Sequence, residues 1–228
     1  MPASQLVEHG WARLPAILSS ARLSSARMST WAPDERLGAG LAGSRNLLDD
    51  ATCRALVAPL RQALQRVGAI APDAVAIQCT LFRKTVDCNW KVPYHQDLSV
   101  PVAERIDRPA LSGWSTKEDG HYVQPPASLL ERLLAVRLHL DPCHAGDGAL
   151  RVLQGTHATG RIAPETIPEL RRDAPEAQCF ADAGDAILMR PLLLHASSKA
   201  ETPSGRRVLH FLFAPPEPGF GLRWRTSV

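Results

Sequence analysis

Apolar residues recur at helical spacing in one stretch near the N-terminus. They are Leu56, Leu60, Leu64 and Val67. A period of three to four residues places these side chains on one face of a helix, which can then pack on a core. The stretch follows Asp49-Asp50 and is closed by Gly68, and residues of these types commonly cap the two ends of a helix. Pro59 interrupts the stretch, so we expect a kinked helix or two short helices.

After residue 74 the pattern changes to short apolar runs separated by turn residues. Five runs read as strands, namely residues 74–82, 133–140, 149–153, 186–189 and 207–213. Short apolar runs bounded by turn signals such as Gly146-Asp147-Gly148 are typical of strands. Many short strands joined by tight turns favour a sandwich or a barrel. The sequence therefore predicts a mainly β body that follows an N-terminal helical region.

The segment from Val100 to Ala127 reads as one long loop between two predicted strands. It holds Trp114, Tyr122 and two adjacent prolines. Loops longer than about 15 residues inside a compact domain tend to be functional or disordered. Because bulky aromatic side chains argue against disorder, we expect this loop to be ordered and functional.

Composition narrows the class of protein. The chain has 228 residues, which fits one large domain, and its formal net charge of +3 is far from the clustered basic patch of a nucleic-acid binder. No run approaches the roughly 18 apolar residues of a membrane helix, and the first residues lack the layout of a signal peptide. Five cysteines without a CxxC spacing argue against a disulfide framework or a thiolate zinc site. We therefore expect a cytoplasmic protein that binds neither nucleic acid nor membrane, and its oligomeric state is unknown at this stage.

Two HxD triplets could supply metal ligands, His95-Gln96-Asp97 and His139-Leu140-Asp141. In a strand, residues i and i+2 point to the same face, so either triplet can offer an imidazole and a carboxylate to one metal ion. A chain with 8 histidines and 23 acidic residues contains about one such triplet by chance, so the context has to decide. The second triplet ends an apolar strand and runs into a proline, which favours a structural role. The first follows the polar and aromatic segment 89–94, which is typical of the mouth of a pocket.

A third ligand and an anchoring cation have candidates further along the chain. His195 closes an apolar run, where a histidine is more often a core residue. As a ligand from a distant strand, it would complete a triad of two histidines and one carboxylate, which leaves three positions open on Fe(II). Eleven residues later Arg206 opens another strand. An arginine can hold a carboxylate through two parallel hydrogen bonds, which suits the far end of a dicarboxylate co-substrate.

The order and spacing of these motifs resemble the phytanoyl-CoA dioxygenase family of Fe(II)- and 2-oxoglutarate-dependent oxygenases, which includes ectoine hydroxylase-like enzymes. The resemblance runs from about Gln78 to Ala214, and the N-terminal 40 residues match weakly. It is carried by residues 89–97, 123–126, 136–141, 148–157, 190–197 and 206–210.

The resemblance implies a fold and a set of site residues. The fold is a double-stranded β-helix, a cupin-like jelly roll. The implied ligands of Fe(II) are His95, Asp97 and His195. By the same resemblance Arg206 anchors a carboxylate of 2-oxoglutarate, Gln78 contacts 2-oxoglutarate, and Arg137 lies on the wall of the co-substrate site.

Arg207 is the alternative anchor. Three apolar residues of the final strand, Leu209, Phe211 and Phe213, share a face with Arg207 and not with Arg206. If that face lined the pocket, Arg207 would hold the co-substrate. The spacing within the motif favours Arg206, and both alternatives stay open at this point.

Trp90, Lys91 and Trp114 flank the predicted mouth of the pocket, and we expect them on the substrate side. The alternative for each is structural, as a packing aromatic residue or a surface lysine. The predicted division of the single domain is a helical flank over about 1–72, a jelly-roll core over about 73–215 and a tail over 216–228.

The resemblance implies an enzyme that hydroxylates a small-molecule substrate with O₂ and 2-oxoglutarate and releases succinate and CO₂. The same iron site could instead catalyse desaturation, cyclisation or epimerisation, and the sequence does not separate these outcomes. A second alternative is a non-catalytic cupin-like protein that binds a metal or another ligand. Gln78 and Arg206 argue against it, because a pure metal binder needs no dicarboxylate anchor.

Overall fold

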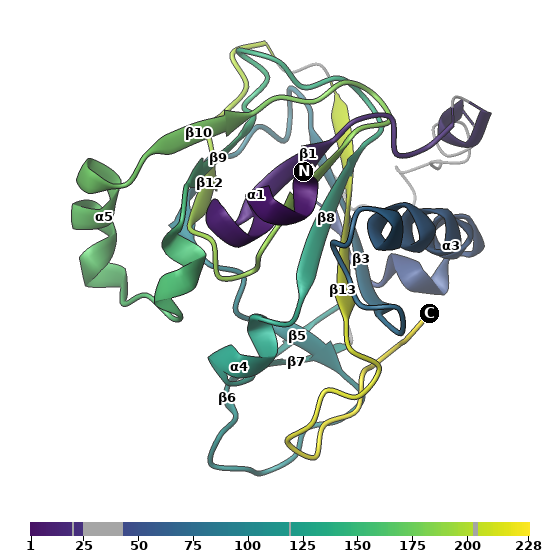
Figure 1. Cartoon of the computed structure of the whole chain (residues 1–228), viewed down its shortest axis with the longest axis vertical. Helices are drawn as coiled ribbons and strands as arrows, with labels where there is room; N and C mark the ends of the chain where they lie inside the picture. The colour runs from purple at the N-terminus through teal and green to yellow at the C-terminus, as the bar shows by residue number, and fades with distance from the viewer. Residues whose placement is uncertain (20, 25–42, 119, 203–204) are drawn as a thin grey trace.

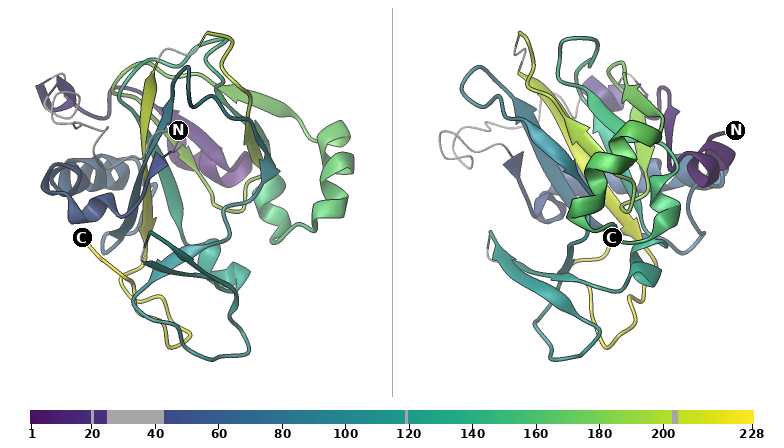
Figure 2. Two further views of the ribbon diagram at one scale, coloured as in Figure 1. Left: turned by 180° about the vertical axis from the view of Figure 1, so that it is seen from behind. Right: turned by 90° about the vertical axis from the view of Figure 1, so that its left-hand side faces the viewer.

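The computed structural model describes residues 1–19, 21–24, 43–118, 120–202 and 205–228 as a β-sandwich flanked by helices (Figure 1). Most of the described strands lie in two antiparallel sheets. This is the double-stranded β-helix, or jelly roll, that the family resemblance implies. Figure 2 shows the sheets from two further directions, with helix α3 outside one sheet and helix α5 beyond the other.

The larger sheet has six strands in the order β1-β11-β8-β13-β3-β2. Their bounds are β1 Trp11–Leu14, β2 Gly43–Ser44, β3 Val75–Lys84, β8 Leu134–His139, β11 Ala186–Met189 and β13 Arg206–Ala214. Four of these match strands that the sequence predicts. The other two, β1 and β2, come from the N-terminal part of the chain, for which only helices were expected. The predicted domain division at about residue 72 stays a prediction, but both parts contribute strands to this sheet.

The smaller sheet has four strands in the order β10-β9-β12-β4. Their bounds are β4 Val92–His95, β9 Leu150–Leu153, β10 Glu176–Cys179 and β12 His195–Ser197. Only β9 was predicted from the sequence. Strands of three or four residues with polar side chains carry too few positions to show a period of two, so β4, β10 and β12 were missed.

The segment 100–127 is not the long loop that the sequence predicts. Its described residues form a third antiparallel sheet in the order β5-β7-β6, which lies at one end of the sandwich (Figures 1 and 2). The bounds are β5 Val100–Val102, β6 Ser112–Lys117 and β7 Gly120–Gln124, with helix α4 Ala127–Leu130 following. The sequence did not indicate these strands because β6 is polar and largely exposed. Val100, Val102 and Val123 are fully or almost fully buried and attach the small sheet to the core.

Helix α3 spans Ala51–Arg66 as one element, so the chain is not divided into two short helices at Pro59. The carboxylate of Asp50 caps its start by accepting hydrogen bonds from the backbone N–H groups of Thr52 and Cys53, at 2.9 and 3.1 Å. Gly68 follows its end with a φ of +67°, in the left-handed region that glycine adopts without strain. These caps confirm the helix ends that the sequence indicates.

The remaining helical elements are short. They are α1 Pro2–Glu8, η1 Leu47–Asp49, η2 Thr156–Thr159, η3 Pro164–Thr166 and α5 Ile167–Asp173. Within the described ranges, none of the helices has both the length and the apolar character needed to cross a lipid bilayer. At the other end of the chain, Val228 exchanges two backbone hydrogen bonds with Ala76, at 2.9 and 3.0 Å, and so joins the edge of the fold beside β3.

Two apolar clusters lie on opposite faces of the larger sheet. Leu209, Phe211 and Phe213 of β13 belong to the cluster that also contains the buried face of α3. Leu212 of the same strand belongs to a second cluster, shared with the small third sheet. Because successive residues of a strand point to opposite faces, this division also decides which residues of β13 can face the interior of the sandwich.

Candidate metal centre and cavity

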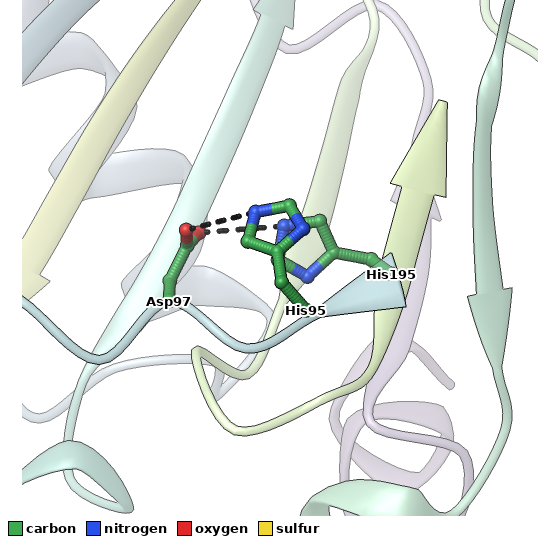
Figure 3. A group of neighbouring side chains, drawn as sticks. All are labelled: His95, Asp97 and His195. Atoms are coloured by element: carbon green, nitrogen blue, oxygen red, sulfur yellow. Dashed lines mark ion pairs between the residues drawn. The ribbon is translucent and has the colours of Figure 1, made fainter. Parts of the chain in front are cut away.

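Two histidines and one carboxylate converge between the sheets (Figure 3). His95, the last residue of β4, lies directly opposite His195, the first residue of β12, in the pairing of these two strands. Asp97 follows β4 by two residues, and its carboxylate oxygens lie 3.8 Å from Nε2 of His95 and 3.7 Å from Nε2 of His195. One ligand atom from each residue lies within 4.8 Å of the others, so a single metal ion can be held by all three.

Backbone carbonyl groups orient both imidazole rings. Nδ1 of His95 lies 2.9 Å from the carbonyl oxygen of Pro93, and Nδ1 of His195 lies 2.9 Å from that of Leu193. A carbonyl oxygen only accepts, so each neutral ring carries its proton on Nδ1 and leaves the lone pair of Nε2 toward Asp97. Metal-binding histidines commonly have this arrangement, in which the second nitrogen fixes the tautomer.

The middle residue of the triplet, Gln96, fixes the segment that carries Asp97. Its amide donates hydrogen bonds to the carbonyl oxygens of Leu192 and Gly160, at 2.6 and 2.7 Å, and its oxygen accepts one from the backbone of Ile162 at 2.9 Å. These bonds tie the end of β4 to the segment before His195. The two halves of the triad are thus held together without a metal bond.

The charges of the triad suit a cation. Burial is the largest influence on His195 and lowers its pKa to about 4, against the opposing effect of Asp97, so the ring stays neutral near pH 7. Burial opposes ionisation of Asp97, but nearby His195, His210 and His95 together hold its pKa below the ordinary value. A metal ion needs neutral imidazole and ionised carboxylate, and these are the forms that the surroundings favour for His195 and Asp97.

A third histidine, His210 on β13, also faces Asp97. Its Nε2 lies 3.9 Å from the carboxylate, and its Nδ1 lies 3.5 Å from the guanidinium of Arg137. Because arginine only donates, Nδ1 is the acceptor and the proton of the neutral ring lies on Nε2, toward Asp97. His210 was not predicted as a site residue from the sequence. Its position on the same face of β13 as Arg206 is the signal that could have found it.

One face of the paired strands β3 and β13 forms the floor of a cavity of about 390 Å³. Alternate residues of the two strands line it, namely Gln78, Thr80, Phe82 and Lys84 on β3 and Arg206, Val208, His210 and Leu212 on β13. In the strand pairing Arg206 lies opposite Lys84 at one end of this floor, and Leu212 lies opposite Gln78 at the other. The triad lies over the middle, beside His210.

Two cations lie close together at the first end of the floor. Arg206 is 6% exposed, and its guanidinium donates to the carbonyl of Gly148 at 3.3 Å while its Nε has no partner among the described residues. Lys84 reaches the hydroxyl of Ser197 at 3.3 Å and the carbonyl of Ser198. Burial, followed by the charge of Arg206, lowers the pKa of Lys84 to about 8. The negative charge of an anion bound between the two cations would offset both effects on Lys84.

Gly148 allows this close approach. It has a φ of +66°, and a Cβ atom there would lie 2.7 Å from Nζ of Lys84 and 2.5 Å from the carbonyl oxygen of Ser198. Any larger residue would therefore displace the lysine or the backbone beside it. The sequence indicates only a turn at this glycine, and Lys84 and Ser197 were not predicted as site residues.

Arg207 points away from the cavity. Its guanidinium donates to the carboxylate of Asp141 at 2.8 and 3.0 Å, and its backbone N–H donates to the same carboxylate at 3.1 Å. The apolar residues that share its face pack in the cluster under α3 and not toward the triad. This contact also accounts for the second HxD triplet, whose Asp141 is engaged by Arg207 and whose His139 is buried in the larger sheet.

Other predicted site residues are distributed around the cavity. Arg137 lines its wall, stacked 5.5 Å from the ring of Phe82, and burial lowers its pKa to about 10. Gln78 lies at the opposite end of the floor from Arg206, so any contact with 2-oxoglutarate would involve a different part of that molecule from the carboxylate at Arg206. The roles of both residues stay predictions.

The three residues expected on the substrate side differ in position. Trp90 lines the cavity, with Nζ of Lys84 5.8 Å from its ring centre. Lys91 is exposed and is not among the lining residues. Trp114 is also outside the lining, where it is half-buried near Arg105. Of these three residues, the structure thus brings Trp90 to the cavity. For all three, a contact with the substrate stays a prediction.

Most of the chain matches the sequence profile of one protein family. Residues 13–208 match the sequence profile of the family described as phytanoyl-CoA dioxygenase (PhyH). A search of curated proteins finds no match. The match covers most of the chain, including all three residues of the triad and both arginines at the start of β13.

Solved structures share the fold at low sequence identity. SnoK, a non-heme alpha ketoglutarate dependent carbocyclase from nogalamycin biosynthesis, has a TM-score of 0.70 at 13% identity, over 96% of this chain and 87% of SnoK. The epimerase SnoN, in complex with Fe3+, alpha ketoglutarate and nogalamycin RO, has a TM-score of 0.65 at 15% identity, over 93% and 82%. EctD from S. alaskensis has a TM-score of 0.65 at 15% identity, over 93% and 75%. At these identities the likeness shows the fold alone.

Proposed function

The chain belongs to the phytanoyl-CoA dioxygenase family, and from this premise we propose that it is an Fe(II)- and 2-oxoglutarate-dependent oxygenase that hydroxylates a small-molecule substrate. Family and structural neighbours together indicate an enzyme of the iron- and 2-oxoglutarate-dependent oxygenase type. The observation that carries the proposal is the convergence of His95, Asp97 and His195 over the middle of a cavity floor that has two buried cations at one end.

The donor set fits ferrous iron. Two neutral imidazoles and one carboxylate, with no thiolate, form the facial triad typical of non-heme Fe(II) oxygenases. In this proposal His95, Asp97 and His195 hold the iron, which supplies the activation of O₂ when it is bound. The fixed tautomers and the ionised carboxylate described above keep all three donors ready for the metal.

The co-substrate would lie between the triad and the cationic end of the floor. Arg206 and Lys84 would hold the distal carboxylate of 2-oxoglutarate, and the hydroxyl of Ser197, which accepts a hydrogen bond from Lys84, would donate to the same carboxylate. Arg206 presents a planar fork that matches a carboxylate, whereas Lys84 adds a point charge. Their burial excludes water from the carboxylate, which strengthens each of these interactions.

Within this proposal hydroxylation is preferred to halogenation. The carboxylate of Asp97 occupies the ligand position that a halide would need. The same iron site would also serve cyclisation or epimerisation, and the carbocyclase SnoK and the epimerase SnoN share the fold. A non-catalytic metal-binding protein is less well supported, because it has no need of the buried Arg206 and Lys84.

Two experiments test the proposal. Anaerobic addition of Fe(II) and then 2-oxoglutarate to the purified protein should produce a weak visible charge-transfer band. With O₂ admitted, a small-molecule screen should then find a compound that raises succinate formation above the uncoupled level and gains 16 Da. The absence of any band in the wild-type protein would contradict the proposal, and a product without added oxygen would favour desaturation, cyclisation or epimerisation. The cytoplasmic location predicted from the sequence remains part of the proposal.

A further inference from the structure

The cavity carries more positive charge than the proposed iron chemistry uses. Its lining contains five cationic side chains, Arg45, Lys84, Lys117, Arg137 and Arg206. Among the described residues that line it, Asp97 is the only carboxylate, and it is a proposed iron ligand. Ferrous iron and the 2-oxoglutarate dianion carry equal and opposite charges, so the excess persists when both are bound. A further anion is therefore the expected occupant of the remaining space.

Lys117 lies on a different wall from the proposed co-substrate anchors. Arg206 and Lys84 are opposite each other at one end of the floor. Lys117 ends strand β6 of the small sheet, and this sheet shares its apolar cluster with Leu212, at the other end of the floor. The lysine is thus placed for a second molecule that lies beyond the triad.

Lys117 forms no salt bridge with a carboxylate in the part of the chain that the structure describes, and the charge of Asp97 acts on it only as the weakest of three influences on its pKa. Its ammonium lies 5.0 Å from the centre of the Tyr122 ring, a cation–π contact that holds it in place without neutralising its charge. Arg45 on the same wall differs, because it is paired with Glu118 at 3.3 Å. Burial, followed by the charge of Arg45, lowers the pKa of Lys117. A bound anion would offset both effects.

Tyr122 offers a second donor beside this lysine. The residue is 2% exposed and lines the cavity, and its hydroxyl is buried without a hydrogen-bond partner among the described residues. Burial raises the pKa of Tyr122, so the hydroxyl stays protonated and can donate. A buried hydroxyl without a partner is costly, and a ligand oxygen that accepts from it would remove that cost.

We propose that Lys117 and Tyr122 bind an oxyanion of the primary substrate, which is therefore a small organic acid carrying a carboxylate or a phosphate group. This inference rests on the proposed oxygenase function. A lysine is a compact point charge that serves either oxyanion. The cavity volume of about 390 Å³ is near the lower end of the range for small-molecule sites, and 2-oxoglutarate takes part of it, which limits the size of the acid. Leu130, Leu133 and Leu212 in the lining suit its hydrocarbon part.

The test measures the binding of three probes to protein loaded anaerobically with Fe(II) and saturating 2-oxoglutarate. Phenylacetate and phenyl phosphate present the two oxyanions, and phenylacetamide is the neutral match of phenylacetate. Isothermal titration calorimetry gives the affinities, and the charge-transfer band reports whether the co-substrate stays bound. We expect at least one oxyanion probe to bind about tenfold or more tightly than the amide, with the band retained, since a charge-assisted hydrogen bond contributes about that much.

Four variants identify the residues responsible. Lys117→Gln should abolish most of the preference for the oxyanion, whereas Lys117→Arg should keep it. Tyr122→Phe retains the ring beside the lysine and removes only the hydroxyl. It should therefore lower the affinity for the oxyanion probe a few-fold and leave the affinity for the amide unchanged. Lys199→Gln is the matched control, because Lys199 is an exposed lysine outside the cavity lining, and its affinities should equal those of the wild type.

Three results would overturn the inference. These are equal binding of acids and amide to the wild type, an undiminished preference in Lys117→Gln, and loss of the band when an acid is added, which would assign the acid to the co-substrate site. A protein that forms no band before any probe is added contradicts the proposed oxygenase function itself, and the inference fails with it. A response to only one of the two acids would separate a carboxylate substrate from a phosphate substrate.

Discussion

Neighbouring arginines at the start of β13 have opposite surroundings. Arg206 lies in the cavity opposite Lys84, whereas Arg207 lies on the other face and holds Asp141. The alternation of a strand makes this difference unavoidable once one face is committed to the core. The apolar residues of the final strand mark the core face under α3, so Arg207, which shares that face, cannot also reach the triad.

We expect the two arginines to respond differently to removal. Arg206→Ala should weaken 2-oxoglutarate binding by about ten- to a hundredfold, because it removes a charge-assisted carboxylate contact, while Fe(II) still binds. Arg207→Ala should leave that affinity unchanged and lower the free energy of unfolding by about 1 to 3 kcal/mol, because Asp141 loses charge-assisted hydrogen bonds in a largely buried pair. Anaerobic titration of the charge-transfer band measures the affinity for 2-oxoglutarate, and urea unfolding measures the free energy of unfolding. If 2-oxoglutarate binding were weakened in Arg207→Ala alone, the anchor would be Arg207 and not Arg206.

Short elements fix the site through their pairing and not through their own stability. Strands β4 and β12 have four and three residues, yet their register places His95 opposite His195. Gln96 adds side-chain hydrogen bonds across the gap. Helix α3 is different, because its caps and its apolar face are all local in sequence and together define a helix of 16 residues. Local signals predicted α3 well, whereas β4 and β12 depend on their neighbours.

The N-cap of α3 provides a test of this local stabilisation. Asp50→Ala should lower the free energy of unfolding by about 1 kcal/mol, because the backbone N–H groups of Thr52 and Cys53 lose their acceptor. Asp73→Ala, at an exposed position outside the helices and strands, is the matched control and should change it by less than about 0.5 kcal/mol. Equilibrium urea unfolding followed by circular dichroism gives both values. Equal effects of the two substitutions would show that the cap does not stabilise the helix.

The sandwich as a whole encloses several titratable groups. His139, His195 and His210 are each no more than 6% exposed. Burial is the main cause that lowers the pKa of His139 to about 3 and of His195 and His210 to about 4. For His139, the nearby charges of Arg137 and Arg206 act in the same direction. Enclosure therefore keeps these rings neutral at pH values where an exposed histidine is charged.

We expect the metal-free protein to lose stability as the pH falls from about 6.5 toward 4. In this window the unfolded chain, whose histidines titrate near pH 6.5, binds more protons than the folded protein, so the free energy of unfolding decreases with falling pH. One pKa unit corresponds to roughly 1.4 kcal/mol, which makes the total loss several kcal/mol. Urea unfolding at pH 7 and pH 5 measures it.

A pair of variants assigns this pH dependence. His139→Asn should make the dependence shallower, because it removes one buried histidine, whereas His121→Asn replaces an exposed histidine and should leave the slope unchanged. Stability that is constant or rises from pH 7 to pH 5 in the wild type would contradict the prediction. A slope that is unaltered in His139→Asn would show that other groups cause it.

The sequence by itself determined the elements whose signals are local. Periodic apolar residues and caps defined α3, apolar runs defined β3, β8, β11 and β13, and motif spacing selected His95, Asp97, His195 and Arg206 as candidates. The helix and strand signals depend on side chains a few residues apart along the chain, which is why they can be recognised in a single sequence. The four site residues come from segments far apart along the chain, and the resemblance to a known family selected them.

Only the tertiary structure decided which candidates share a space. It separated Arg206 from Arg207, replaced the expected long loop by a small sheet, and brought Lys84, Lys117 and His210 to the same cavity. Strand pairing sets these neighbours, and pairing between residues far apart in the chain has no local signature. The charge of the cavity is likewise a property of surfaces that meet only after folding, so it is visible in the fold and not in the order of residues.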